Sequence, residues 1–187
     1  FARKLKVLIP GMKTVFGGAH ITASAEHIDM DGIDIAVQGP VYGTIDEILS
    51  APENTVIQGQ PVMPNKMIPT RTEYFEQIPR IGKHHRKFIM SHFGCVYACS
   101  YCATHNQRLT IGAEKYRKFF LTRRPVDDVI AEGRILLQYD TIEVGLEDDD
   151  ALEGHEAEAW LADFVPKWKE EIGLPVYANV TPKTVVK

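Results

Sequence analysis

Short apolar runs alternate with amphipathic stretches along most of this chain. The apolar runs are bounded by glycine or polar residues, and they predict β-strands over residues 14–16, 34–37, 88–90, 141–146 and 174–180. Apolar residues at helical spacing predict helices over residues 125–139 and 155–172, and residues 24–30 are enough for a short helix. Strands and helices that alternate at this spacing are typical of an α/β fold with parallel sheets.

The helix predicted over residues 155–172 has a stripe of large apolar side chains on one face. The stripe consists of Trp160, Leu161, Phe164 and Trp168. It is typical of a helix that packs against a core, and not of a cofactor site. Pro166 lies within the same stretch and is expected to kink the helix or to split it in two.

All the cysteines of the chain lie in one short segment, at Cys95, Cys99 and Cys102, in the pattern C-x3-C-x2-C. They follow the strand predicted over residues 88–90, which we expect to be buried, and Gly94 lets the backbone turn sharply so that the thiols converge. Three thiolates leave one iron of a four-iron, four-sulfur cluster open to a small molecule, whereas four thiolates close it. The pattern therefore predicts chemistry at a cluster that sits at the carboxyl end of a strand.

A structural zinc site is the alternative for these thiols, with His105 or His92 as the fourth ligand. Such sites usually pair short C-x2-C units that lie far apart in the sequence, which is not the spacing here. A disulfide framework fits less well still, because the number of thiols is odd and they are crowded together.

A proline-containing stretch with little periodicity follows the first strands, and its prolines are Pro52, Pro61, Pro64, Pro69 and Pro79. This composition is typical of a linker. We therefore predict a first region at residues 1–55, a linker at 56–85 and a second region at 86–187. Residues 1–8 read as the end of an amphipathic helix, and the last residues directly follow a predicted strand, so we expect an internal piece of a longer protein.

The overall composition is ordinary for a globular protein, with 44% hydrophobic residues, 25% charged residues and a formal net charge of -4. This charge argues against a nucleic-acid-binding surface, although residues 83–87 form a local basic cluster. No apolar run reaches the length of a membrane span, and no signal peptide opens the chain. We expect a cytoplasmic protein with neither a membrane nor a nucleic acid as partner.

The segment Cys95-Val-Tyr-Ala-Cys99-Ser-Tyr101-Cys102 resembles the signature of the radical S-adenosylmethionine (radical SAM) superfamily, including the aromatic residue before the third cysteine. The resemblance implies that the three cysteines hold a [4Fe-4S] cluster and that Tyr101 lies against the adenine of S-adenosylmethionine. It also implies cleavage of S-adenosylmethionine to a 5'-deoxyadenosyl radical, with an electron donor of the flavodoxin or ferredoxin type. The implied fold is a partial (β/α) TIM barrel, with its first half at residues 86–187.

An acidic run, residues 147–150, follows the strand predicted over residues 141–146. Four adjacent carboxylates in a loop are usually solvated, but the carboxyl end of a barrel strand favours a site. In the radical SAM family the end of this strand helps to hold the amino group of S-adenosylmethionine. The resemblance therefore implies Glu147, Asp148 and Asp149 as candidates for that contact.

The first region has a resemblance of its own. Residues 15–23 and 34–49 are similar to the late part of the Rossmann-like cobalamin-binding domain that precedes many radical SAM domains. The sequence departs from that family at residues 40–42, where an acidic residue is common. A glycine pair at the end of a strand also lets the backbone approach a ligand closely. The resemblance implies cobalamin contacts at Gly17, Gly18, His20, Thr22 and Gly39.

The two resemblances together imply a cobalamin-dependent radical SAM enzyme, and the expected reaction is methylation of an unactivated carbon in a small-molecule substrate. A radical SAM enzyme without cobalamin, acting by rearrangement, cyclisation or methylthiolation, is the alternative enzyme. Methylthiotransferases carry further cysteines upstream, and the first region has none. The alternative outside enzymes is a structural zinc or iron-sulfur module.

Overall fold

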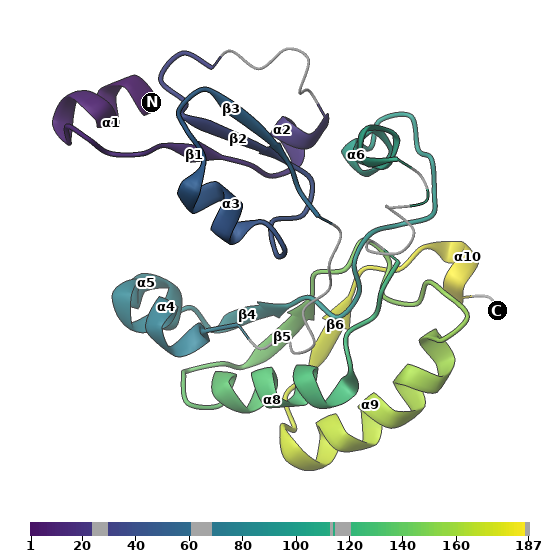
Figure 1. Cartoon of the computed structure of the whole chain (residues 1–187). Coiled ribbons are helices and arrows are strands. Elements are labelled where there is room, and N and C mark those ends of the chain that lie inside the picture. The colour runs from purple at the N-terminus through teal and green to yellow at the C-terminus, as the bar shows by residue number, and fades with distance from the viewer. Residues whose placement is uncertain (24–29, 61–68, 113, 115–120, 186–187) are drawn as a thin grey trace. The chain divides into compact units, whose positions relative to one another are not determined.

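The computed structural model of the chain describes residues 1–23, 30–60, 69–112, 114 and 121–185. The chain divides into two compact units, whose elements are labelled in Figure 1. Unit 1 consists of residues 1–64 and 96–119, and unit 2 consists of residues 65–95 and 120–187. Each unit is therefore assembled from two separate segments of the chain.

Unit 1 contains a parallel sheet of three strands in the order β1-β2-β3. The strands are β1 (Val15–Phe16), β2 (Ile35–Gln38) and β3 (Thr55–Gln58). The helices of unit 1 include α1 (Ala2–Leu8), α2 (Ala19–Ala23), α3 (Ile45–Ser50) and α6 (Ala103–Ile111). All four residues of β2 are buried, as its nearly continuous apolar sequence requires of a central parallel strand. The core of this unit consists of Ile35, Val37, Ile48 and Ile57.

A buried carboxylate joins the first helix of unit 1 to its sheet. Asp34 precedes β2, and its Oδ2 accepts hydrogen bonds from the backbone N–H and the hydroxyl of Thr14, at 2.8 and 2.9 Å. Its Oδ1 is paired with the ammonium group of Lys6 on α1. The hydrogen bonds from Lys6 and from the Thr14 backbone lower the pKa of Asp34 to about 2.

Unit 2 contains a second parallel sheet of three strands, in the order β4-β5-β6. The strands are β4 (Arg86–Ile89), β5 (Glu143–Leu146) and β6 (Val176–Ala178). The helices of unit 2 include α4 (Arg71–Gln77), α5 (Pro79–Gly82), α8 (Val126–Leu136), α9 (Ala157–Glu171) and α10 (Pro182–Val185). Helices α8 and α9 cover one face of this sheet (Figure 1). None of the helices in the described ranges is long and apolar enough to cross a membrane.

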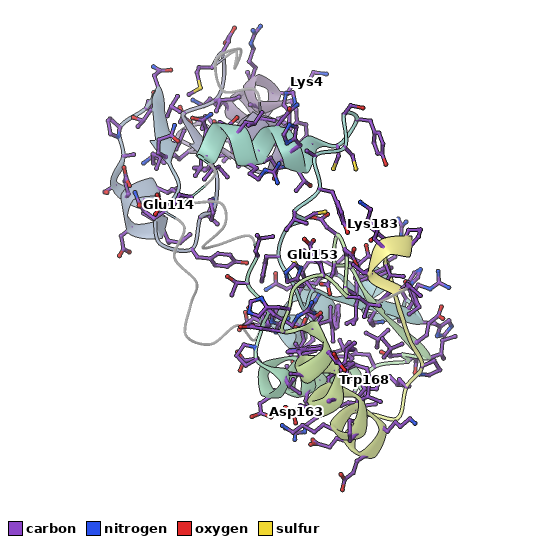
Figure 2. All side chains as sticks on the ribbon, turned by 90° about the vertical axis from the view of Figure 1, so that its right-hand side faces the viewer. Lys4, Glu114, Glu153, Asp163, Trp168 and Lys183 are labelled. Atoms are coloured by element: carbon purple, nitrogen blue, oxygen red, sulfur yellow. The ribbon has the colours of Figure 1, made fainter. Side chains whose placement is uncertain are left out.

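The core of unit 2 depends on the aromatic stripe of α9. Trp160 stacks on Phe164 with ring centroids 4.6 Å apart, and Phe164 contacts Trp168 at 5.2 Å. These rings pack against Val144 and Leu146 of β5 and against the apolar side of α8. Figure 2 labels Trp168 on this buried side of α9 and the exposed Asp163 on the same helix. The predicted packing role of the stripe is confirmed.

The α/β class and the parallel strands predicted from the sequence are confirmed, but the effect of Pro166 is not as severe as expected. Helix α9 runs without a break from Ala157 to Glu171, so Pro166 does not split it. Pro166 is exposed, and so is Ala162, whose carbonyl group is the one that Pro166 leaves without an N–H donor. Because that carbonyl lies on the solvent side, water can satisfy it.

The strand predicted over residues 88–90 was expected to be buried, and this expectation is wrong for two of its three residues. Ile89 is buried, whereas Phe88 and Met90 are exposed. Strand β4 as a whole alternates, with Lys87 and Ile89 buried and Arg86 and Phe88 exposed. The strand alternates because the described helices cover only one face of its sheet. On the other face, Gly145 leaves room for the ring of Tyr177, since a Cβ at position 145 would lie 2.6 Å from that ring.

Part of the segment predicted as a linker, residues 56–85, is regular structure. Strand β3 pairs with β2 as far as Gln58, and helices α4 and α5 belong to unit 2. The sequence of β3 is too short and too polar on one side for its pattern to stand out among the neighbouring prolines. The helix predicted over residues 24–30 falls almost entirely on residues 24–29, which lie outside the described residues.

Candidate functional site

The cysteine segment, residues 95–102, follows shortly after β4, which ends at Ile89. Gly94 has φ 82°, a left-handed conformation that favours glycine, so the sharp turn predicted before Cys95 is confirmed. The N–H of Cys102 donates to the carbonyl oxygen of Cys99 at 3.0 Å, which puts these two residues on one turn immediately before α6. Cys95 and Cys102 are half-buried, Cys99 is exposed, and the three thiols form no disulfide.

The three cysteines do not all belong to the same unit. Cys95 is in unit 2, whereas Cys99 and Cys102 are in unit 1. Among the described residues, no group of three or more His, Cys, Asp or Glu side chains surrounds a common metal position. The role of the three thiols as one ligand set therefore stays a prediction.

The residues predicted beside the cysteines differ widely in exposure. Tyr101 is 91% exposed, which leaves its ring accessible to a ligand. His105 lies on α6 with its Nδ1 3.1 Å from Nη2 of Arg108. His92 is 3% exposed, and its Nδ1 has no hydrogen-bond partner among the described atoms. His92 is thus enclosed within unit 2 instead of presenting itself as a surface ligand.

Burial and the guanidinium group of Arg123 lower the pKa of His92, and the carboxylates of Asp148 and Asp150 offset this only in part. Arg123 forms a β-bridge with His92 and stacks on the ring of Trp160 at 5.2 Å. Its Nη2 donates to the Glu153 carbonyl oxygen at 2.7 Å. Burial also lowers the pKa of Arg123, against the opposing effect of the nearby acidic groups.

The lowered pKa of His92 predicts that unit 2 becomes less stable as the pH falls. The unfolded chain takes up the histidine proton first, near pH 6.5, so the stabilisation is complete above about pH 6.5 and is lost as the pH decreases towards the folded pKa. The slope contributed by one such group is at most about 1.4 kcal/mol per pH unit. Urea unfolding across this range should show a smaller slope for His92→Asn than for the wild type.

His155→Gln is the matched control for that measurement, because His155 has a side chain that is 94% exposed. The wild-type slope should persist in this variant. Equal slopes for the wild type and His92→Asn would show that the buried histidine does not control the acid sensitivity.

The acidic run after β5 divides into two exposed and two buried side chains. Glu147 and Asp149 are exposed, whereas Asp148 is 2% and Asp150 0% exposed. Partial desolvation and the neighbouring Asp148 carboxylate raise the pKa of Asp149. Of the three candidates predicted for the S-adenosylmethionine amino group, only Glu147 and Asp149 are accessible from solvent.

Each buried aspartate accepts several hydrogen bonds from the segment that follows a neighbouring strand. Asp148 accepts from the backbone N–H groups of Ser91 and His92, at 2.6 and 2.9 Å, and from the Ser91 hydroxyl. Asp150 accepts from the hydroxyls of Thr181 and Thr184, at 2.8 and 3.1 Å. Neither Asp150 nor Ser91 was among the site residues predicted from the sequence. The sequence signal for Asp150 was its spacing of two residues from Asp148, because alternate residues of an extended chain point to the same side.

At the carboxyl edge of the first sheet, Thr22 links the two predicted glycine loops. Its hydroxyl donates to the Gly18 carbonyl oxygen at 2.8 Å and accepts from the Gly39 N–H at 2.9 Å. Gly18 and Gly39 have φ 91° and 83°, so both need the conformational freedom of glycine. Gly17 and His20 are exposed at the same edge. Of the five residues predicted to contact cobalamin, four thus follow β1 closely, and the hydroxyl of Thr22 connects them to Gly39 after β2.

Gln38 is a further polar residue at this edge, and it was not predicted from the sequence. It is the last residue of β2 and is 5% exposed. Its Oε1 accepts from the side chain of Gln58, the last residue of β3, while its Nε2 has no hydrogen-bond partner among the described atoms.

Comparison of this chain with protein-family models, with curated proteins and with solved structures finds no match.

Proposed function

We propose that this protein is a cobalamin-dependent radical SAM enzyme. The observation that carries the proposal is the C-x3-C-x2-C pattern, which begins shortly after the first strand of a parallel sheet, following a turn at Gly94 with its left-handed φ. Chemistry in α/β folds is typically placed at the carboxyl ends of parallel strands. In this proposal unit 2 is the first half of a radical SAM barrel, and the sheet of unit 1 comes from a Rossmann-like cobalamin-binding domain.

The donor set fits an open iron-sulfur cluster better than it fits zinc. Three thiolates leave one iron of a [4Fe-4S] cluster free, whereas structural zinc sites in proteins use four protein ligands. Of the two histidines that could supply a fourth ligand, His92 is enclosed among unit 2 side chains. His105 is half-buried on α6, with its Nδ1 3.1 Å from Nη2 of Arg108. Cys95, Cys99 and Cys102 would hold the cluster.

When bound, the reduced cluster would supply the electron that cleaves S-adenosylmethionine to a 5'-deoxyadenosyl radical. Methylcobalamin would supply the methyl group for an unactivated carbon of the substrate. The exposed ring of Tyr101 is available to lie against the adenine. Glu147 and Asp149 offer exposed carboxylates to the amino group of S-adenosylmethionine. The loops at Gly17–Gly18 and Gly39 offer backbone without side chains to cobalamin.

The proposal includes a small-molecule substrate, a flavodoxin-type or ferredoxin-type electron donor and a cytoplasmic location, with neither a membrane nor a nucleic acid as partner. The competing proposals are a radical SAM enzyme of another reaction type without cobalamin, and a structural zinc or iron-sulfur module. Residues 1–94 contain no cysteine, which counts against the methylthiotransferases among the former.

Anaerobic purification followed by iron, sulfide, zinc and cobalt analysis and a visible spectrum tests the proposal. We expect about four irons per chain, acid-labile sulfide and bound cobalamin. Reduction in the presence of S-adenosylmethionine should then release 5'-deoxyadenosine or S-adenosylhomocysteine. Iron without cobalamin would favour the cobalamin-free enzyme, and a colourless protein that contains zinc would overturn the radical SAM assignment.

A further inference from the structure

We infer that Asp148 positions the backbone that leads into the cysteine segment, and that it does not contact S-adenosylmethionine. This inference rests on the proposed function, because it assigns the residue a role in placing Cys95. It separates Asp148 from Glu147 and Asp149, which the sequence places with it as equivalent candidates.

Both oxygens of the Asp148 carboxylate are already used. Oδ1 accepts two backbone N–H groups, from Ser91 at 2.6 Å and from His92 at 2.9 Å, and Oδ2 accepts the Ser91 hydroxyl. The residue is 2% exposed. An ammonium group would have to enter a position that is almost closed to solvent and compete there with three donors that are already in place. Displacing the backbone N–H groups would leave them unsatisfied.

The segment that Asp148 holds is anchored from a second side. The Arg124 N–H donates to the Ser91 carbonyl oxygen at 2.8 Å, and the Phe93 N–H donates to the Thr122 carbonyl oxygen at 3.1 Å. Residues 91–93 are therefore held by Asp148, in the loop after β5, on one side and by the chain before α8 on the other. Cys95 lies two residues beyond this fixed segment, so the position of its thiol depends on it.

Asp150 provides a comparison within the same loop. It is equally buried and also accepts several hydrogen bonds, but its donors are Thr181, Thr184 and Leu152. Asp148 thus ties the end of β4 to β5, and Asp150 ties the segment after β6 to β5. Only the first of these two connections leads to a cysteine.

The test compares Asp148→Ala, Asp148→Asn and Asp150→Ala in the full chain. Asparagine keeps one oxygen for the two backbone N–H groups and can donate its amide to the Ser91 hydroxyl, so it preserves the geometry while it removes the charge. We expect Asp148→Asn to retain its iron and to bind S-adenosylmethionine within about fivefold of the wild type. We expect Asp148→Ala to lose iron and to alter the electron paramagnetic resonance spectrum of the reduced cluster.

Amide hydrogen exchange in the peptide that contains residues 89–95 provides a readout that is independent of the cluster. Asp148→Ala should accelerate exchange at Ser91 and His92 by about 10-fold to 100-fold, the effect of losing hydrogen bonds to a charged group. Asp150→Ala should leave this peptide and the iron content unchanged, even if the two alanine variants lose similar amounts of thermal stability.

Two results would overturn the inference. One is an Asp148→Asn protein that keeps its iron but no longer binds S-adenosylmethionine, which would show a direct charge contact. The other is an Asp148→Ala protein with wild-type iron content and exchange. A wild-type chain without iron would instead overturn the proposed function, and with it the role in placing a cluster ligand; the exchange data would then report on the hydrogen bonds alone.

Discussion

Replacing any one of Cys95, Cys99 and Cys102 by alanine is expected to remove almost all of the iron from the anaerobically purified protein. Two thiolates leave two irons of a four-iron cluster without a protein ligand, and such a cluster is easily lost. Since the chain has no other cysteine, no thiol can substitute for the missing one. Iron and sulfide analysis, with the visible spectrum before and after reduction, measures the result.

Ser100→Ala is the matched control for the cysteine variants. Ser100 lies between Cys99 and Cys102 and is exposed, so the change leaves the segment and its three thiols in place. It should keep the wild-type iron content. A single-cysteine variant that also keeps its iron would remove that cysteine from the ligand set and would contradict an open cluster held by three thiolates.

Glu132→Ala is expected to destabilise unit 2 strongly. Glu132 lies on α8 and is 0% exposed. Its Oε1 lies 2.6 Å from Nη2 of Arg71, and its Oε2 lies 2.7 Å from Nη1 of Arg124. The alanine variant leaves two guanidinium groups without their anion, and the side chain of Arg124 is only 3% exposed. Removing one partner of a buried ion pair in this way costs about 3–5 kcal/mol of unfolding free energy.

The same two arginines also connect α8 to the strand that leads to the cysteines. Arg71 Nη2 donates to the Phe88 carbonyl oxygen at 2.7 Å, and Arg124 Nη1 donates to the Met90 carbonyl oxygen at 2.6 Å. Urea unfolding of Glu132→Ala should therefore show its loss in the unit 2 transition. Glu171→Ala, which removes an exposed partner of Arg134, should cost only about 0–1 kcal/mol. Similar losses of unfolding free energy in Glu132→Ala and Glu171→Ala would show that the buried ion pairs of Glu132 stabilise unit 2 no more than an exposed pair does.

The elements with strong apolar patterns were predictable from the sequence. Strand β2, helix α8 and the aromatic face of α9 each bury side chains in the spacing that the sequence displays. Strand β3 was missed because its four residues alternate and only Ile57 is buried. The alternation of β4 was missed because exposure depends on which face of a sheet is covered, which the strand sequence alone does not determine.

The candidate site was predictable only where a single segment contains it. The three cysteines stand within one segment, so their spacing is visible in the sequence. The function of Asp148 depends instead on donors that lie 57 and 56 residues earlier and are brought near by the register of β4 with β5. Glu132 likewise meets Arg71 across 61 residues, so its helix sequence suggests a solvated carboxylate. Such partnerships follow from strand pairing and helix packing, which sequence spacing does not record.

Helix α6 has a further consequence for the order in which the protein is made. It packs against α2, and its Ile111 would lie 3.6 Å from a Cβ at Gly39. In the sequence, however, residues 65–95, which belong to unit 2, lie between α6 and the other elements of unit 1. A ribosome adds about 5–20 residues per second, so about 2–10 seconds pass between the synthesis of residue 64 and that of Ile111. Throughout that interval the nascent sheet of unit 1 has no α6 beside it, and chaperones that bind incomplete surfaces have time to act there.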